Sequence, residues 1–444
     1  MIWPMRHRSS VLRWCGLLLG LPLIALALVV VSAAIPNQLV TERIHEAILD
    51  GTITEKSLTT GFTGNTIDGF SECKRMTVGL GAPDGMSLFE SAVRSPTLGR
   101  CEWTVPKIRD WAEGARLERS FDYYRYWNGS TVLLRPSVAA VGVAGTRLIA
   151  AMALVATMLA FAVMLGRRVG RGAAVMALAP LLLTTDYIDL PGALLHAIGM
   201  IVAFGVAAAM LRWLRPDSSI ETYAAVAFTG GAASLFFADL TNPDATWALI
   251  VVSATVVAVG AVHVADTARR TIATAGAWIL GFVWMWASKW LIASFVLGFS
   301  TVRQEISDKT EERLNGEVQG VGDSRLAGLH RAWHKWWDQP MFFIVVVLLV
   351  TVAALVVWRR GDLASTWRRR LLIATPAVIP FCWHIVMRQH TVIHYWFTYR
   401  SFPVALGIVL LALAARLKPS PVDLDAPDAS RTTQPERVEA DTAS

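Results

Sequence analysis

Charged side chains are scarce in this sequence. They make up 17% of its 444 residues, whereas a soluble globular chain carries about 25%. Hydrophobic residues make up 54%, and they come in blocks close to the roughly 20 residues that cross a bilayer as a helix. The lack of charge therefore excludes an ordinary soluble fold. The composition predicts an all-α, polytopic transmembrane helical bundle.

Other absences narrow the function further. The net charge is +7, but the basic residues lie dispersed in short clusters between apolar runs, so we expect no nucleic-acid partner. No internal repeat is evident, which gives an inverted-repeat transporter little support. No spacing is diagnostic of a metal site. Short acidic turns leave a divalent cation open as a cofactor, and no other cofactor is expected. These turns carry Asp186, Asp189, Asp239 and Asp244.

The apolar runs predict about ten membrane spans. We expect them at approximately 14–36, 137–165, 172–185, 192–213, 222–239, 245–265, 272–298, 341–358, 371–387 and 402–416. The first run is longer than the apolar core of a signal peptide, which favours an uncleaved anchor over a cleaved leader. Alternate connections are short and rich in arginine, as in "GRRVGRG" and "RRGDLASTWRRR". By the positive-inside rule, both termini are expected in the cytoplasm.

This topology divides the chain into four parts. They are a cytoplasmic segment with the first anchor (1–36), a large extracytoplasmic loop (37–136), a multi-span domain (137–416) that includes an outer loop at 299–340, and a cytoplasmic tail (417–444). The tail is polar and lacks aromatic residues, so we expect disorder there. Most chemically interesting residues fall outside, which predicts a plasma-membrane protein with its functional face extracytoplasmic.

Only four cysteines are present. Cys73 and Cys101 both lie in the 37–136 loop, where oxidation is permitted, so a disulfide between them is expected, with two free thiols as the alternative. Cys15 and Cys382 lie in predicted spans and are interpreted as packing residues.

The segment "GFTGNTIDGFSECKR" presents Asp68 on a glycine-rich turn just above the membrane. A carboxylate in that position is a candidate general base. The alternative is an Asx-turn carboxylate that holds the loop.

The same loop ends in "FDYYRYWNGSTVLLRP", residues 121–136. An aromatic belt at the membrane interface would account for Tyr126 and Trp127. Aromatic rings mixed with arginines also suit sugars and diphosphates, and Arg125 and Arg135 can each form bidentate hydrogen bonds to a phosphate. All four are candidate substrate-binding residues.

Lys289 lies inside the apolar run 272–298. An ammonium at that depth is costly unless it is paired or hydrated, which makes it a candidate partner for a lipid phosphate. Snorkelling to the interface is the alternative. His196, His263 and His384 are expected to be hydrogen-bonded interior histidines.

The stretch "RQHTVIHYWFTYR" at 388–400 carries more polar chemistry than a connector needs. His390 and His394 are spaced i, i+4 and would share a helical face. With Arg400 they are predicted to form a phosphate- or sugar-contacting wall of an outward-facing cavity. A zinc site would need a further ligand, and none is evident nearby.

These features resemble the C superfamily of membrane glycosyltransferases (GT-C). Its members have a cytoplasmic N-terminus, a long first outer loop with an acidic catalytic residue, and basic residues that hold a polyprenyl-linked donor. The resemblance implies Asp68 as the acid, with Glu42 and Asp50 as rivals, and Lys289, Arg125 and Arg400 as phosphate ligands. No adjacent Asp-Asp or Asp-Glu pair follows the first span, unlike the family pattern. The segments "YYRYWNGSTVLLRP", "MWASKW" and "HTVIHYWFTYR" also resemble a group of bacterial multi-pass membrane proteins.

The resemblance implies transfer of a sugar from a polyprenyl-phosphate donor to a cell-envelope glycan acceptor, with membrane lipids as further partners. One alternative is a transporter or flippase of a lipid-linked or anionic solute. Others are a ligase or polymerase of surface glycans, and an envelope-assembly protein without catalysis.

Overall fold

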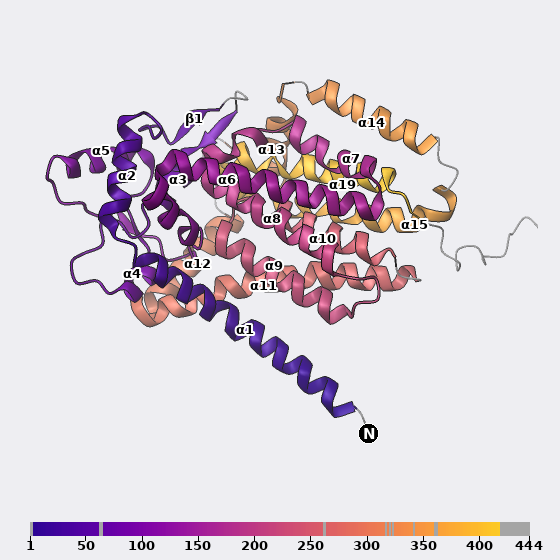
Figure 1. The fold of residues 1–444 in the computed structure, drawn as a ribbon, viewed down its shortest axis with the longest axis horizontal. Helices are drawn as coiled ribbons and strands as arrows, with labels where there is room; N and C mark the ends of the chain where they lie inside the picture. The colour runs from indigo at the N-terminus through magenta and orange to yellow at the C-terminus, as the bar shows by residue number, and fades with distance from the viewer. Residues whose placement is uncertain are drawn as a thin grey trace, which may run out of the picture.

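A computed structural model describes residues 3–61, 65–260, 263–315, 318, 321, 324–340, 342–358 and 363–417 of the chain. The described chain is helical almost throughout (Figure 1), which confirms the predicted all-α class. Its strands are short and pair in two antiparallel ribbons, β1 (Leu58–Thr60) with β2 (Thr66–Asp68) and β3 (Pro96–Thr97) with β4 (Phe121–Asp122). The predicted disordered tail lies outside the described residues, apart from Leu417.

Six helical segments of the described chain are long and apolar enough to cross a membrane. They lie in α1 (Trp3–Ala33), α6 (Thr131–Val169), α8 (Leu194–Trp213), α9 (Ile220–Ala238), α11 (Val264–Leu297) and the segment Tyr395–Ala414, which contains α18 (Tyr395–Thr398) and α19 (Ser401–Ala414). A seventh is added if α13 (Ala327–Trp337) and α14 (Phe342–Trp358), which meet at 90°, cross together. The protein is therefore a multi-pass membrane protein.

The expected count of about ten spans is not confirmed. The other predicted spans are helical but short. They correspond to α7 (Arg171–Leu183), α10 (Pro243–Ala258), and a broken run of α15 (Leu363–Ala374), η2 (Thr375–Val378) and α16 (Ile379–Val386). Apolar composition does not decide whether these helices cross the membrane, because a buried core helix has the same composition as a short span.

Close backbone approach joins α9 to α11. Gly231 on α9 faces the carbonyl of Trp278, and Gly281 on α11 faces the carbonyl of Phe228. A side chain at either glycine would collide with the opposite backbone. Small residues at such a crossing let two membrane helices pack by close van der Waals contact. This contact drives helix association in a membrane, because the hydrophobic effect does not favour contact between helices that lipid already surrounds.

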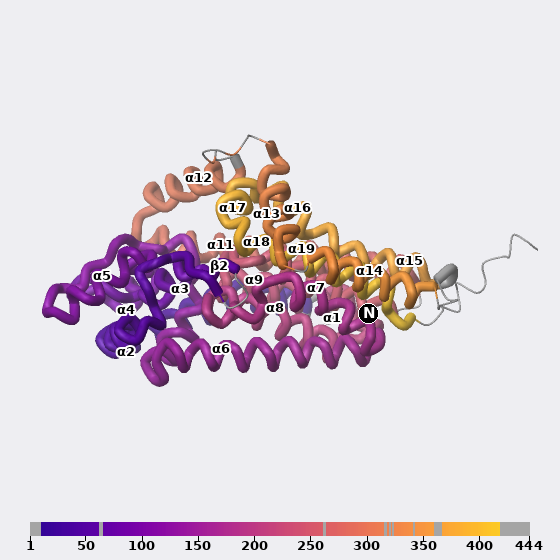
Figure 2. The backbone as a smooth tube through the Cα atoms, turned by 90° about the horizontal axis from the view of Figure 1, so that it is seen from above, coloured from indigo at the N-terminus to yellow at the C-terminus, as the bar shows by residue number. Residues whose placement is uncertain are grey.

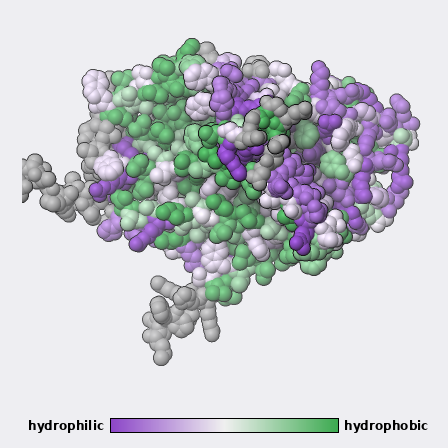
Figure 3. Space-filling view, turned by 180° about the vertical axis from the view of Figure 1, so that it is seen from behind, coloured by the Kyte–Doolittle hydropathy of each residue, from purple (hydrophilic) through white to green (hydrophobic). Residues whose placement is uncertain are grey.

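A polar subdomain occupies one end of the bundle (Figures 1 and 2). It contains α2 (Asn37–Leu49), α3 (Gly69–Met76), α4 (Leu88–Arg94) and α5 (Cys101–Ala112). Figure 3 shows hydrophilic side chains gathered at this end and hydrophobic ones over much of the bundle. Two further helices pack on each other near it, α12 (Phe299–Asn315) and α17 (Arg388–Ile393).

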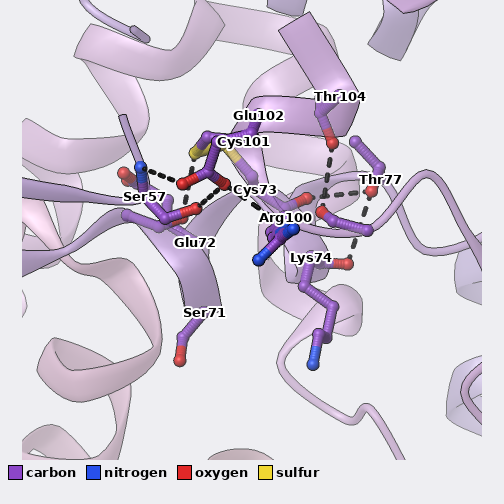
Figure 4. Close-up of a disulfide and its surroundings, with 12 residues drawn as sticks. Ser57, Ser71, Glu72, Cys73, Lys74, Thr77, Arg100, Cys101, Glu102 and Thr104 are labelled. Carbon is purple, nitrogen blue, oxygen red and sulfur yellow. Dashed lines mark hydrogen bonds and ion pairs between the residues drawn. A yellow bond between two sulfur atoms is a disulfide. The ribbon is translucent and has the colours of Figure 1, made fainter. Parts of the chain in front are cut away.

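The disulfide expected from the sequence is present and ties α3 to α5 (Figure 4). The Cα atoms of Cys73 and Cys101 lie 5.2 Å apart. Asp68 begins α3, since its Oδ1 accepts a hydrogen bond from the Ser71 amide at 3.1 Å. The bridge and the cap together fix the orientation of α3, the helix that carries much of the site described next.

Candidate functional site

A polar cavity of about 180 Å³ lies between the subdomain and the bundle. Side chains reach it from α3, from the segment after β4, from the turn between α9 and α10, and from α12 and α17. Its cationic members are Lys74, Arg75, Arg125 and Arg313. Sequence-distant segments therefore converge on one small volume rich in positive charge.

One face of α3 lines the cavity. Phe70, Ser71, Lys74 and Arg75 are spaced i, i+1, i+4 and i+5, which puts them on the same side of a helix. Figure 4 shows Ser71 and Lys74 pointing the same way, while Cys73 faces the bridge to Cys101. The disulfide thus anchors the face of α3 opposite to the one that lines the cavity.

Lys74 presents a buried ammonium to the cavity. Its side chain is 8% exposed, and Nζ lies 4.2 Å from the ring centre of Phe70 and 4.4 Å from that of Tyr123. No carboxylate pairs with it in the part of the chain that the structure describes. Burial lowers the pKa of Lys74, because the charged form has lost its water. An anion in the cavity would supply the missing partner.

The phenol of Tyr123 also responds to this charge. Its burial would raise the pKa, but Lys74, Arg75 and Arg125 outweigh that effect and lower the pKa of Tyr123 to about 7. A phenol that ionises near neutrality indicates a strong local excess of positive charge.

The remaining charges do not cancel this excess. Asp239 is the one carboxylate among the described residues that line the cavity, and it already pairs with Arg75. Arg125 reaches Glu305 at 3.5 Å, a long ion pair at a partly exposed position. The cavity therefore has the charge and the size to hold a phosphate or sulfate group.

Two histidines complete the wall, as expected from their spacing. His390 and His394 both line the cavity, with ring centres 4.8 Å apart. Burial lowers the pKa of both imidazoles, that of His394 to about 3, with Arg313 adding to the effect. Both rings are neutral, and His390 Nε2 donates to the carbonyl of Leu240 at 3.1 Å. No three His, Cys, Asp or Glu side chains converge as a metal site within the described chain.

Asp68 lies directly behind the cavity rather than in its wall. Its Oδ2 accepts from Ser71 Oγ at 2.7 Å and lies 3.0 Å from His196 Nε2. Burial would raise the pKa of Asp68, but the hydrogen bonds from His196 and Ser71 win and lower it to about 2. Ser71 lines the cavity and so connects Asp68 to it. Asp68 therefore acts as the cap of α3, which fits the interpretation that its carboxylate holds the loop. Its contact with Ser71 keeps the general-base interpretation open.

The tautomer of His196 follows from its second contact. Arg400 Nη1 lies 2.8 Å from His196 Nδ1, and a guanidinium can only donate, so Nδ1 accepts. The proton therefore sits on Nε2 and is donated to Asp68. His196 is a hydrogen-bonded interior histidine, as expected, and its partner is the candidate acid.

Arg400 is buried in the same network. Its Nε donates to Asp186 Oδ1 at 2.6 Å, and Nη2 bonds Asp186 Oδ2. Tyr399 donates to Asp186 as well, at 3.1 Å. The prediction that Arg400 contacts a phosphate is revised, since this guanidinium supports His196 and Asp68 from behind the cavity.

Three other predicted binding residues lie outside the cavity wall. Lys289 Nζ donates to the carbonyl of Val93 at 2.8 Å, in the last turn of α4. This contact is neither the phosphate binding nor the snorkelling that the sequence suggested. Trp127 is fully buried and its Nε1 donates to the Met285 carbonyl at 2.6 Å. Both side chains attach the subdomain to α11. Their substrate-binding assignment is therefore replaced by a structural one.

Arg135 is likewise committed to protein carbonyls. Its Nε donates to Ser32 at 3.0 Å and its Nη1 to Val78 at 2.8 Å, while Nη2 reaches Ile35 and Asn37. These bonds join α1 to the subdomain. The rival acids lie elsewhere too: Glu42 bonds Gln38 along α2, and Asp50 bonds the Thr52 amide.

Of the predicted binding residues, Arg125, Tyr126, His390 and His394 line the cavity. Four lining residues were not predicted to bind substrate: Lys74, Arg75, Tyr123 and Arg313. The pair "KR" nearly two helical turns beyond the Asp68 cap was a signal for the first two, because a cap at Asp68 sets the face on which they lie. Comparison of the chain with known protein families, curated proteins and solved structures gives no match.

Proposed function

We propose that the chain is a membrane glycosyltransferase of the GT-C type. It would transfer a sugar from a polyprenyl-phosphate donor to a cell-envelope acceptor at the extracytoplasmic face of the plasma membrane. The observation that carries the proposal is the cationic cavity, connected through Ser71 to the buried carboxylate of Asp68. A cation cluster beside an acid matches what such a transfer needs, which is a held phosphate and a group that receives a proton.

The donor's phosphate would bind among Lys74, Arg125 and Arg313. The bond that breaks joins the sugar's anomeric carbon to the phosphate oxygen, so negative charge grows on the departing polyprenyl phosphate. Fixed cations in a site shielded from water stabilise that charge without reorganising. His390 and His394 would form hydrogen bonds with sugar hydroxyls through their Nδ1 atoms, which have no partner among the described residues.

The acceptor's hydroxyl proton would leave through Ser71. As the new glycosidic bond forms, Ser71 Oγ takes the acceptor's proton and passes its own to Asp68, 2.7 Å away. A carboxylate whose pKa is about 2 is a weak base. It therefore accepts the proton only late, once the acceptor oxygen has bonded to a sugar carbon with oxocarbenium character.

The test uses membranes containing the full chain and a panel of polyprenyl-phosphate sugars, with release of polyprenyl phosphate as the readout. Asp68→Asn is expected to lower kcat by about 10²-fold or more, and Lys74→Met to weaken donor binding about tenfold or more. Arg116→Gln is the matched control, because Arg116 is an exposed cation paired with Asp84 in the same subdomain. Full activity of Asp68→Asn, or no transfer from any donor, contradicts the proposal.

A parallel measurement separates the transporter alternative. The same protein in vesicles would be supplied with a fluorescent polyprenyl phosphate, and its movement between leaflets followed by quenching. Protein-dependent movement without sugar transfer would replace the enzyme with a flippase that uses the same cations.

A further inference from the structure

A second site lies between α6 and α7, lined by residues far along α6 from the subdomain. It is a groove of about 810 Å³, within the roughly 300–1,000 Å³ of typical ligand sites. Small residues such as Ala162 and Gly166 on α6 and Ala174 and Ala179 on α7 leave this volume open. The groove is unrelated to the cationic cavity.

The sharp reversal from α6 to α7 creates the groove. Gly170 has φ +99°, a backbone conformation that a side chain rarely adopts. The chain therefore turns back on itself within one residue, and α7 begins beside the end of α6 (Figure 2). Arg416, from beyond α19, packs against Gly170 and bonds the Val169 carbonyl through its amide at 2.8 Å.

The groove opens to the membrane. Val163, Val175 and Leu183 line it and remain 47%, 64% and 57% exposed. Exposed apolar side chains on these helices face the hydrocarbon of the bilayer. A hydrocarbon chain is the occupant that this lining suits.

Two arginines line the groove near the turn between the helices. Arg167 and Arg171 line the groove on either side of the Gly170 turn, and both are exposed. Neither forms an ion pair or side-chain hydrogen bond within the described chain, and no described carboxylate lines the groove. Their neighbour Arg168 differs, since it donates to the carbonyls of Leu211 and Leu214 at the end of α8. Arg167 and Arg171 are therefore free to bind an anion.

We infer that this groove binds an anionic diacyl phospholipid of the cytoplasmic leaflet. One acyl chain lies in the apolar part between α6 and α7, and the headgroup phosphate meets the guanidiniums of Arg167 and Arg171. Arginine-rich loops mark the cytoplasmic side of membrane proteins, and basic pockets between helices on that side bind anionic headgroups. The inference does not depend on the proposed enzymatic function.

The test is native mass spectrometry of the full chain released from detergent, with phosphatidylglycerol and phosphatidylcholine of identical acyl chains added in equal amounts. Wild type is expected to retain phosphatidylglycerol preferentially. Each guanidinium contributes about fivefold, so Arg167→Gln with Arg171→Gln should reduce the preference by about 25-fold. Arg212→Gln, an exposed arginine on α8 that does not line the groove, is the matched control and should change nothing.

A second variant tests the groove without touching its charge. Ala162→Trp fills the apolar part, and it is expected to reduce retention of phosphatidylglycerol while the protein's melting temperature stays close to that of wild type. Equal retention of both lipids by wild type would overturn the inference. An unchanged preference in the double arginine variant, or undiminished binding in Ala162→Trp, would overturn it as well.

Discussion

Arg400 donates from Nη1 to Nδ1 of His196 at 2.8 Å, although 204 residues separate them in the chain. This contact fixes the histidine proton on Nε2 and aims it at Asp68. The bidentate pairing of Arg400 with Asp186 in turn holds the guanidinium in place. A buried hydrogen-bonded chain thus couples the start of α19 to the cap of α3, and its Asp68 end reaches the cationic cavity through Ser71.

Removing Asp186 tests this coupling. Asp186→Ala leaves Arg400 buried without its counter-ion, and loss of one partner of a buried pair costs about 3–5 kcal/mol of unfolding free energy. Asp186→Ala combined with Arg400→Met should lose less than the sum of the single changes. The measurement is thermal unfolding in detergent, with the exposed Asp84→Ala as control. Strictly additive losses would show that the two side chains are not coupled.

Lys289 and Lys74 are expected to behave in opposite ways. Lys289→Met removes the ammonium that bonds the end of α4, so it should destabilise the protein by about 1–3 kcal/mol and leave anion affinity unchanged. Lys74→Met should weaken binding of inorganic pyrophosphate about tenfold or more, with little loss of stability, because its ammonium has no carboxylate partner. Calorimetric titration and unfolding of both variants give the comparison. If Lys289→Met weakened anion binding and Lys74→Met only lowered stability, Lys289 would be the residue that binds the anion.

Anion affinity should fall as pH rises through about 7. The pKa of Tyr123 is lowered to about 7, so the phenol is neutral below that pH and a phenolate above it, where it competes with a bound anion for the same cations. Inorganic sulfate is the probe, since its own charge is constant over this range. Tyr123→Phe should flatten the profile between about pH 6 and 8. A slope that persists in the variant assigns the titration to another group.

The same shift has a consequence for stability with a defined sign. The pKa of Tyr123 is lower in the folded than in the unfolded chain, where it is about 10. Its stabilising contribution is therefore complete above about pH 10 and is lost as pH falls to about 7. In urea titrations, wild type should gain stability relative to Tyr123→Phe as pH rises through that window.

The disulfide is expected to support the cavity as well as the fold. Replacing Cys73 and Cys101 by serine opens a loop with a sequence separation of 28, which costs about 3–4 kcal/mol by the loop-entropy relation. Because the bridge holds the rear of α3, pyrophosphate binding should weaken in the same variant. Cys15→Ser and Cys382→Ser, at exposed positions, serve as controls. Unchanged stability in the bridge variant would contradict the role given to this bond.

Part of the site could be predicted from sequence. The i, i+4 spacing of His390 and His394 placed both on one face, and both line the cavity. Arg125 and Tyr126 were found because arginine beside tyrosine suits a phosphate-bearing sugar. Lys74 was missed because a lysine in a short polar helix is ordinarily a solvated one. Only its enclosure by Phe70 and Tyr123 makes it unusual.

The sequence alone determined that the protein is helical and membrane-spanning, and which two cysteines could pair. These properties depend on hydrophobic runs and on which residues share a loop, both of which are local. Only the tertiary structure decided which cations face the cavity and which bond backbone carbonyls, as Lys289 and Arg135 do. That choice depends on the rotation and packing of whole helices, which residue order does not reveal. The number of spans does not follow from apolar length alone, because a short apolar helix is equally compatible with the membrane and with a protein interior.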